Sequence, residues 1–260
     1  MTATVPGILA RIVAHKQSEL AALIARRAGL ERDAQLAPRR DFRAALIGKV
    51  PAIIAEAKKA SPSKGLLSGD YDPARIAAAY ESAGASAVSV LTDERFFQGS
   101  LADLRAARAA IGIPVLRKDF TIDEIHVVEA GANGADAILL IAAILTTPQM
   151  LRFRELAAQF GMAALVEVHN EEELERAIDS GAEILGVNNR DLHTFQVSLH
   201  TSLKLAGRIP SRAIKVSESG IHSASDIRIL RDAGYQAFLV GEHLMKSGDP
   251  VQALSALLLR

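Results

Sequence analysis

The sequence predicts an α/β protein, a (β/α)8 TIM barrel with an N-terminal helical extension. Three observations predict this class: eight short apolar runs, helical periodicity between them, and a length of 260 residues, which suits a barrel of usual size. The runs are PAIIAEAKK, SAVSVLTDE, IPVLRKDF, ADAILLIAA, MAALVEVHN, EILGVNNRD, AIKVSESG and AFLVGEHLM. Most of them end in polar or ionisable residues, which are costly to bury unless they are paired. Because the carboxyl ends of barrel strands share one rim, the pattern predicts a functional site at that rim.

Residues 1–50 are predicted to form the helical extension, and residues 51–260 the barrel. Apolar residues recur at helical spacing over residues 5–30, which predicts an amphipathic helix. The polar segment from Glu31 to Arg40 contains Pro38, so we expect a connector there. A short helix should follow from about Asp41 to Ile47, and Pro51 should open the first strand.

The helices of the barrel carry clear boundary signals. Asp72 before Pro73 and Thr147 before Pro148 each pair a capping residue with a proline at the helix start. Asn170, followed by three glutamates, is a further cap with acids in the first turn. The phrases SAGAS, EAGANGAD, DSGAEI and RDAGYQAF each place a glycine at a helix end just before the next strand.

An open, doubly wound sheet is the alternative architecture. Such a sheet needs a topological switch point and usually carries a glycine-rich turn after its first strand. The first turn here, KKASPSKG, is not GxGxxG. Eight uninterrupted strand and helix units also favour closure into a barrel.

Composition and charge are those of an ordinary globular protein. The chain is 49% apolar and balances 30 Lys and Arg against 30 Asp and Glu. No basic stripe of the kind that binds nucleic acid is present, and the absence of cysteine excludes disulfides, thiol catalysis and cysteine-ligated zinc. No apolar stretch is long enough for a signal peptide or a membrane span. We therefore expect a cytoplasmic protein, a monomer or weak homodimer, that binds neither nucleic acid nor membrane.

Ionisable residues at the strand ends share the face of the apolar residues that should fill the barrel. Side chains two residues apart in a strand point to the same face. Glu56 therefore points to the same face as Lys58, Lys118 as Leu116 and Phe120, Glu167 as Leu165, and Asn188 as Gly186. These groups could form a structural ion-pair layer, although buried ion pairs rarely stabilise a fold more than apolar packing does. Two lysines and two carboxylates in one pocket would shift each other's pKa values and could act as acid and base.

The last two strand ends are candidates for binding a phosphate group. In barrels, the ends of strands seven and eight often hold phosphate on backbone amides and a helix N-terminus. Gly220 and Gly241 would allow close backbone approach, and Ser219 and the amide of Glu242 would add donors. The loop Ser61-Pro62-Ser63-Lys64-Gly65 could close from the opposite side. The alternatives are two tight turns without a ligand and a mobile surface loop.

Six segments together resemble the signature segments of the indole-3-glycerol-phosphate synthase family. They are EAKKASPSKG, RKDF, ALVEVHNEEEL, GVNNRDL, SESGI and VGEHLM, and the resemblance extends to the N-terminal ILARIVAHKQSEL. It implies ring closure of 1-(2-carboxyphenylamino)-1-deoxyribulose 5-phosphate to indole-3-glycerol phosphate, with release of carbon dioxide and water. This is a step of tryptophan biosynthesis, catalysed by a carboxy-lyase that needs no metal or organic cofactor.

Carried over residue by residue, the resemblance implies four acid, base or charge roles. Lys118 would be the general acid that protonates the substrate carbonyl. Lys58, paired with Glu56, would hold the substrate carboxylate and assist dehydration. Glu167 would stabilise the cationic ring intermediate or act as base. The division of acid and base roles among these four residues stays open.

The resemblance also implies binding roles. Asn188 and Ser219 would orient substrate hydroxyls and their catalytic neighbours, and Arg190 would face the carboxylate. The phosphate site would comprise Ser61, Gly220, Gly241 and the Glu242 amide. Apolar walls for the anthranilate ring would come from Phe97, Phe120, Leu139, Leu192 and Val240, although each could equally be ordinary barrel packing. Two positions depart from the family: Ala60 replaces a basic residue of some relatives, and Glu242 puts a carboxylate near the phosphate.

The histidines do not have the spacing of metal ligands. His169 shares the face of Glu167 but lies beside the cap at Asn170. His193, His200, His222 and His243 lack ligand spacing such as HExxH. Surface or supporting roles are therefore expected, without a metal.

Two rival functions remain open at this point. Phosphoribosylanthranilate isomerase is a neighbouring phosphate-binding barrel that would use a Cys–Asp acid and base pair, and the absence of cysteine argues against it. A catalytically silent barrel that only binds phosphorylated metabolites or a partner subunit should have lost an acid or a base. Here the candidate acids and bases are all present.

Overall fold

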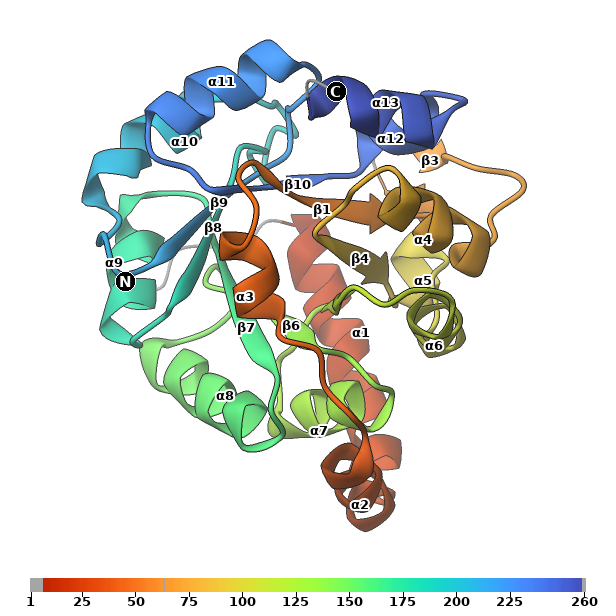
Figure 1. Cartoon of the computed structure of the whole chain (residues 1–260). Coiled ribbons are helices and arrows are strands. Elements are labelled where there is room, and N and C mark those ends of the chain that lie inside the picture. Colours follow the sequence, from red (N-terminus) through yellow and green to blue (C-terminus); the bar gives the residue numbers. More distant parts are fainter. Residues whose placement is uncertain (1–6, 63, 259–260) are drawn as a thin grey trace.

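A computed structural model describes residues 7–62 and 64–258, and its parallel strands close into an eight-stranded barrel (Figure 1). In chain order the strands are β1 (Ala52–Ala57), β4 (Ala87–Leu91), β5 (Val115–Lys118), β6 (Ala137–Ile141), β7 (Ala163–Val168), β8 (Ile184–Asn188), β9 (Ile214–Glu218) and β10 (Ala237–Val240). Each strand pairs with the next, and β10 returns to β1, where Ala52 lies opposite Ala237. The predicted (β/α)8 barrel is confirmed.

Helices surround the barrel and begin at the predicted signals. They are α4 (Pro73–Ser82), α5 (Glu94–Phe97), α6 (Leu101–Ala110), α7 (Glu124–Ala132), α8 (Thr147–Gln159), α9 (Glu171–Asp179), α10 (His200–Leu205), the 3-10 turn Ala206–Arg208, α11 (Ala224–Asp232), α12 (Glu242–Lys246) and α13 (Pro250–Leu257). Asp72 and Asn170 cap α4 and α9 as predicted. The cap of α8 is Thr146 rather than Thr147, because the Thr146 hydroxyl accepts from the amide of Gln149, whose side chain reaches back to Thr146.

The core has two layers, which strand alternation separates. Residues such as Ile54, Leu116, Leu165 and Val216 fill the barrel interior, and the residues between them face the helices. The inward face of each strand therefore continues from a packed apolar layer to the carboxyl rim.

The N-terminal extension contains one more helix than predicted. It comprises α1 (Gly7–Ile24), α2 (Arg27–Leu36) and α3 (Phe42–Ile47), so the expected connector at Glu31–Arg40 is wrong over most of its length. Leu30 and Ala34 bury one side of α2, which packs against α7. The apolar spacing of this short helix is sparse, and tertiary packing stabilises it. Residues 5 and 6 of the predicted first helix lie outside the described residues.

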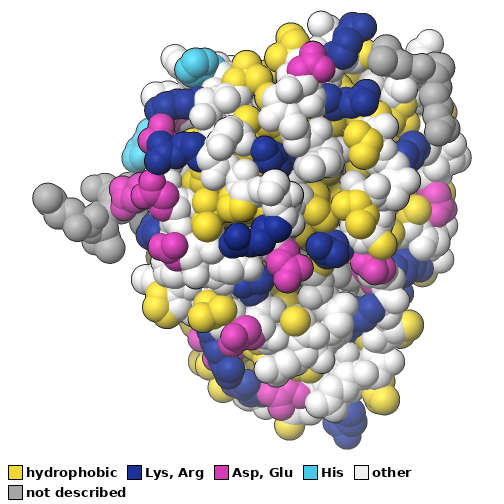
Figure 2. All heavy atoms as spheres, turned by 60° about the vertical axis from the view of Figure 1, so that its left-hand side comes forward, with side chains coloured by type: hydrophobic (Ala, Val, Ile, Leu, Met, Phe, Trp, Pro, Cys, Tyr) yellow, Lys and Arg dark blue, Asp and Glu magenta, His cyan; other side chains and the backbone are white. Residues whose placement is uncertain are grey.

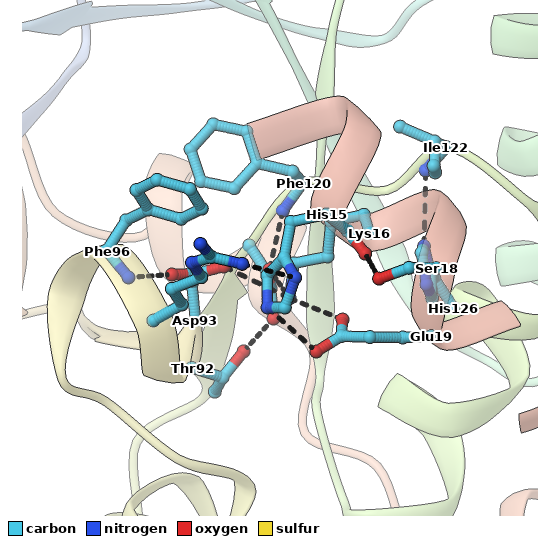
Figure 3. Close-up of polar contacts among 12 residues, drawn as sticks. His15, Lys16, Ser18, Glu19, Thr92, Asp93, Phe96, Phe120, Ile122 and His126 are labelled. Carbon is cyan, nitrogen blue, oxygen red and sulfur yellow. Dashed lines mark hydrogen bonds and ion pairs between the residues drawn. The ribbon is translucent and has the colours of Figure 1, made fainter. Parts of the chain in front are cut away.

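The helices α3 and α1 lie at opposite ends of the barrel (Figure 1). Phe42 and Leu46 of α3 join the interior layer beside Ala52 and Ile54, at the amino end of β1. At the other end, Lys16 of α1 is only 6% exposed and lies among Thr92, Asp93 and Phe120 (Figure 3). Its ammonium is 2.9 Å from Oδ1 of Asp119 and 3.3 Å from Oδ2 of Asp93.

Basic and acidic side chains are interspersed on the face drawn in Figure 2. Within the described residues, no helix is both long and apolar enough to cross a bilayer.

Candidate active site

A cavity of about 350 Å³ opens at the carboxyl rim of the barrel. Its volume is within the range of small-molecule sites. Every candidate residue lines it: Glu56, Lys58, Ser61, Phe97, Lys118, Phe120, Leu139, Glu167, Asn188, Arg190, Leu192, Ser219, Gly220, Val240, Gly241 and Glu242. Helix α1 adds an apolar wall that was not predicted, formed by Ile8, Leu9 and Ile12.

Two lysine–glutamate pairs occupy the floor of the cavity. The ammonium of Lys58 lies 2.5 Å from Oε1 of Glu56. The ammonium of Lys118 lies 3.2 Å from Oε2 of Glu167. Both carboxylates are buried, at 4% and 3% exposure, so each depends on its lysine for charge compensation.

Glu218 is a third buried carboxyl group, and it was missing from the sequence-based candidates. Its Oε2 is 4.0 Å from the ammonium of Lys118, and its Oε1 has no hydrogen-bond partner among the described residues. A Cβ at Gly186 would lie 2.1 Å from that Oε1, so only glycine leaves room for the carboxyl. Glu218 shares the inward face of Val216, and the same alternation that selected Glu167 could have identified it.

The pKa values of this cluster diverge. Burial and the charge of Glu167 raise the pKa of Glu218 to about 8, so its carboxyl is protonated at neutral pH. Burial alone would raise the pKa of Glu167, but the charges of Lys118 and His169 outweigh it and hold that pKa well below the usual range. Burial would lower the pKa of Lys118, yet Glu167, Glu218 and Glu56 together raise it. The site therefore combines a neutral acid, an ionised carboxylate and a protonated amine.

Arg190 lies at the edge of the cavity and already has a partner. Its Nη2 is 3.2 Å from Oε2 of Glu242, and its backbone amide donates to Oδ1 of Asn188. Lys246 donates to the other oxygen of Glu242 at 2.7 Å. The carboxylate that the sequence placed near the phosphate is thus bound by two cations, so its repulsion of an anion is reduced.

The turns after β9 and β10 are tight for different reasons. Ser219 and Gly220 both have left-handed backbone, with φ of 65° and 77°. The side-chain amide of Asn189 donates to the Ser219 carbonyl at 3.1 Å and supports that turn. A Cβ at Gly241 would lie 2.3 Å from Oε1 of Glu56, so this glycine lets the last turn approach a carboxylate of the floor.

The part of the cavity wall that follows β4 and β5 is partly apolar. The rings of Phe97 and Phe120 lie 5.8 Å apart, and both line the cavity. Ser61 belongs to a small hairpin of β2 (Ala60–Ser61) and β3 (Gly65–Leu66), and Lys64 at its tip also lines the cavity. Ser63 of this loop lies outside the described residues.

The histidines near the site lie in two different environments. His169 lies between Glu167 and Glu173, whereas the rings of His222 and His243 stack edge to face at 5.7 Å on the cavity rim. Within residues 7–62 and 64–258, no three His, Asp or Glu side chains are grouped to hold a metal ion.

Fold and site together define a (β/α)8-barrel protein of the enzyme class, with a cavity and buried lysine–glutamate pairs at the carboxyl end of its strands. A sequence profile described as indole-3-glycerol phosphate synthase matches residues 9–257. The chain belongs to the indole-3-glycerol phosphate synthase family. It is 52% identical to the enzyme of that name from Chromobacterium violaceum over 96% of this chain and 97% of that protein. The Desulfotalea psychrophila enzyme is 50% identical over 96% of this chain and 98% of its own length.

Solved structures with low sequence identity share the fold. KGPDC from Streptococcus mutans has a TM-score of 0.62 at 13% identity and covers 81% of this chain and 96% of its own. A thiamine phosphate pyrophosphorylase from Pyrococcus furiosus has a TM-score of 0.57 at 17% identity, covering 80% of this chain and 94% of its own. These similarities concern the barrel alone.

Proposed function

We propose that this protein closes the ring of 1-(2-carboxyphenylamino)-1-deoxyribulose 5-phosphate to give indole-3-glycerol phosphate, carbon dioxide and water, as a step of tryptophan biosynthesis. Relatives that are half identical along nearly their whole length carry the name of this activity. The observation that supports it best is the buried cluster of Lys118, Glu167 and Glu218, because the reaction needs proton donors and an anion in one dry pocket.

Ring closure joins the carboxylate-bearing ring carbon to the substrate carbonyl carbon. The carbonyl oxygen gains electron density as this bond forms and must receive a proton to become a hydroxyl. Lys118 is assigned this donation, because its amine is held protonated by the surrounding carboxyl groups. The ring then carries positive charge, which the carboxylate of Glu167 would stabilise.

Decarboxylation and dehydration complete the reaction. Loss of carbon dioxide returns the bonding electrons to the ring. The hydroxyl then leaves as water, which takes up one proton, while another proton leaves the substrate, so one acid and one base are needed. Lys58 is assigned to hold the carboxylate and to assist dehydration, because its pairing with Glu56 places a cation at the cavity floor. Glu167 is the candidate base.

The substrate phosphate is assigned to the turns after β9 and β10. The residues Ser219, Gly220 and Glu242 line the cavity, and Ser61 and Lys64 line it from the hairpin that follows β1, the strand next to β10. Asn188 and Ser219 would orient the hydroxyls between the two ends of the substrate. The anthranilate ring would lie against Phe97, Phe120, Leu139, Leu192 and Val240.

The test is direct assay of the purified protein. Indoleglycerol phosphate should appear, by fluorescence, when the carboxyphenylamino-deoxyribulose phosphate is added, with one carbon dioxide released per turnover. Binding of the substrate without product would instead favour a catalytically silent, metabolite-binding barrel. Inorganic phosphate should compete with the substrate, and its electron density in a soaked crystal should lie at the two turns. Density elsewhere on the rim would contradict the phosphate assignment.

A further inference from the structure

His169 lies between the cavity floor and a second groove on the same rim. The groove has a volume of about 940 Å³ and runs beside the ends of β6, β7 and β8. The side chain of His169 is 9% exposed and lines this groove, whereas Glu167, two residues earlier, lines the active-site cavity. The imidazole thus fills the wall between the two spaces.

The two ring nitrogens of His169 face two different carboxylates. Nε2 lies 3.3 Å from Oε1 of Glu167, the oxygen that Lys118 does not contact. Nδ1 lies 3.0 Å from Oε2 of Glu173, which also accepts from the His169 backbone amide at 2.8 Å. Glu173 belongs to the first turn of α9 and is tied to the cap residue Asn170. The imidazole is therefore anchored on the Glu173 side and directed at Glu167.

The charges around this imidazole favour its protonated form. Glu167 faces it from β7 and Glu173 from α9, while the remaining ionisable residues of the groove are Glu172, Arg176, Arg190, Asp191 and His193. Arg176 is directed away, because its guanidinium donates to the carbonyls of Leu145 and Ala142. Burial would lower the pKa of His169, but the adjacent carboxylates of Glu167 and Glu173 raise it to about 10.

We propose that His169 is a positioning residue for the reaction: anchored by Glu173, its imidazolium holds Glu167 ionised and in the rotamer that faces the substrate and Lys118. The inference rests on the proposed function, because it deepens the role assigned to Glu167. It goes further in adding a residue that does not touch the substrate cavity and in tying the catalytic carboxylate to α9.

A structural role alone would predict something else. A histidine needed only to start α9 would act through Glu173, and its contact with Glu167 would be incidental. The contact with Glu167 is an ion pair at 3.3 Å without hydrogen-bond geometry, since Nε2 has no hydrogen-bond partner among the described residues. Catalytic contacts are often long before the substrate binds and then tighten. The structural role therefore depends on Nδ1 and Glu173, whereas the positioning role depends on Nε2 and Glu167.

A matched pair of variants separates the two nitrogens. In His169→Asn the amide reaches the Nδ1 position, which keeps the donor to Glu173 and loses the one to Glu167. In His169→Gln the amide reaches the Nε2 position and keeps a neutral donor to Glu167. We expect kcat of the Asn variant to fall by about 10- to 100-fold, the equivalent of one charged hydrogen bond, with KM nearly unchanged. The Gln variant should recover part of this loss. His193→Asn, an exposed histidine on the same groove, should match the parent protein.

The pH dependence of kcat tests whether the charge of the His169 imidazolium matters. Losing the imidazolium raises the pKa of Glu167, so the acidic limb of kcat should move to higher pH in both His169 variants. Wild-type kcat and an unmoved limb in a folded Asn variant would overturn the proposal. A drop in kcat that is equal in Asn and Gln, with no movement of the limb, would also overturn it.

An activity-independent measurement keeps this result distinct from failure of the proposed function. The imidazole of His169 should titrate by NMR near pH 10 in the parent protein and at a clearly lower pH in Glu167→Gln, where Glu173 alone remains to raise its pKa. An ordinary pKa in the parent would overturn the positioning role, whether or not the protein turns over the substrate. A parent protein that binds the substrate without product would overturn the function while leaving the titration valid.

Discussion

Lys118 lies between two carboxyl groups that differ in charge. Glu167, at 3.2 Å, is ionised, and Glu218, at 4.0 Å, is neutral at pH 7 because its pKa is raised to about 8. Had both been ionised, the buried site would carry an excess negative charge next to a substrate that is itself an anion. The protonated Glu218 removes that excess and supplies a second proton donor within the cavity.

Replacing Lys118 should affect turnover more than binding. Lys118→Met keeps much of the side-chain volume but removes the proton donor, so kcat should fall by at least about 100-fold. Substrate affinity, measured by calorimetry, should change far less, since Lys58 and the two turns remain. Turnover near the parent value would contradict the assignment of Lys118 as the general acid.

Glu218 should be visible in the alkaline limb of the pH profile. If turnover needs its proton, kcat declines as the pH rises through about 8, where the carboxyl ionises. Glu218→Gln is permanently uncharged, so its profile should lack this limb, and its kcat near pH 7 should be lower because the amide is a poor acid. A limb that persists unchanged in Glu218→Gln would assign it to another group.

Single residues also differ in whether the sequence predicts their place in the structure. Glu56, Lys58, Lys118 and Glu167 were predictable because strand alternation and the resemblance agree on them. Lys16 was not, because a lysine on an amphipathic helix is normally exposed, and only the docking of α1 reveals its two carboxylate partners.

At the scale of elements, α1 and β5 are joined through Asp119. This residue follows Lys118 directly, and its carboxylate accepts from Lys16, Thr92, Arg117 and the amide of Phe120. The same helix supplies the apolar wall of Ile8, Leu9 and Ile12. One buried ion-pair network therefore fixes both the wall of the cavity and the strand end that carries Lys118.

Lys16→Met tests this junction. Removing the cation leaves the buried carboxylate of Asp93 without its ion-pair partner, which should cost about 3 kcal/mol of unfolding free energy in urea titrations. KM should rise as well, because the helix wall loses its anchor. Lys16→Arg keeps the charge and should lie closer to the parent in both measurements. Unchanged stability and KM in Lys16→Met would show that α1 is held by its apolar contacts alone.

Elements were predictable where local chemistry decides them. The eight strands and the caps at Asp72 and Asn170 follow from apolar runs and from side chains that satisfy free backbone amides. Helix α2 and the hairpin Ala60–Leu66 were missed, because the helix depends on packing against α7 and the hairpin has only two short paired segments.

At the scale of the whole molecule, some buried ionisable groups make the free energy of unfolding rise with pH, and others make it fall. The pKa of His126, lowered to about 3 by burial, makes stability rise with pH up to about 6.5, where the unfolded histidine has lost its proton. The lowered pKa values of Glu56 and Glu167 add stability that is lost as the pH falls below about 4.5. The raised pKa of His169 has the reverse sign, since its contribution is full below about 6.5 and is lost as the pH rises toward 10. The raised pKa of Glu218 makes stability decline further as the pH rises from about 4.5 to 8.

These signs predict a stability maximum on the acidic side of neutrality. Thermal midpoints should be highest between about pH 4.5 and 6.5 and should decline on both sides. Glu218→Gln removes one of the alkaline contributions, so its midpoint should decline less between pH 6 and 8 than that of the parent. A maximum above pH 8 would contradict the assignment of raised pKa values to His169 and Glu218.

The pairing of β1 with β10 has a consequence for synthesis on the ribosome. The register Ala52↔Ala237 joins the first barrel strand to the last, so β1 has an unpaired edge until almost the whole chain has emerged. Nascent sheets with open edges are prone to pair with other chains, which makes this interval the one in which chaperone protection matters most. The cavity floor is completed at the same moment, because Gly241 approaches Glu56 only when β10 pairs with β1.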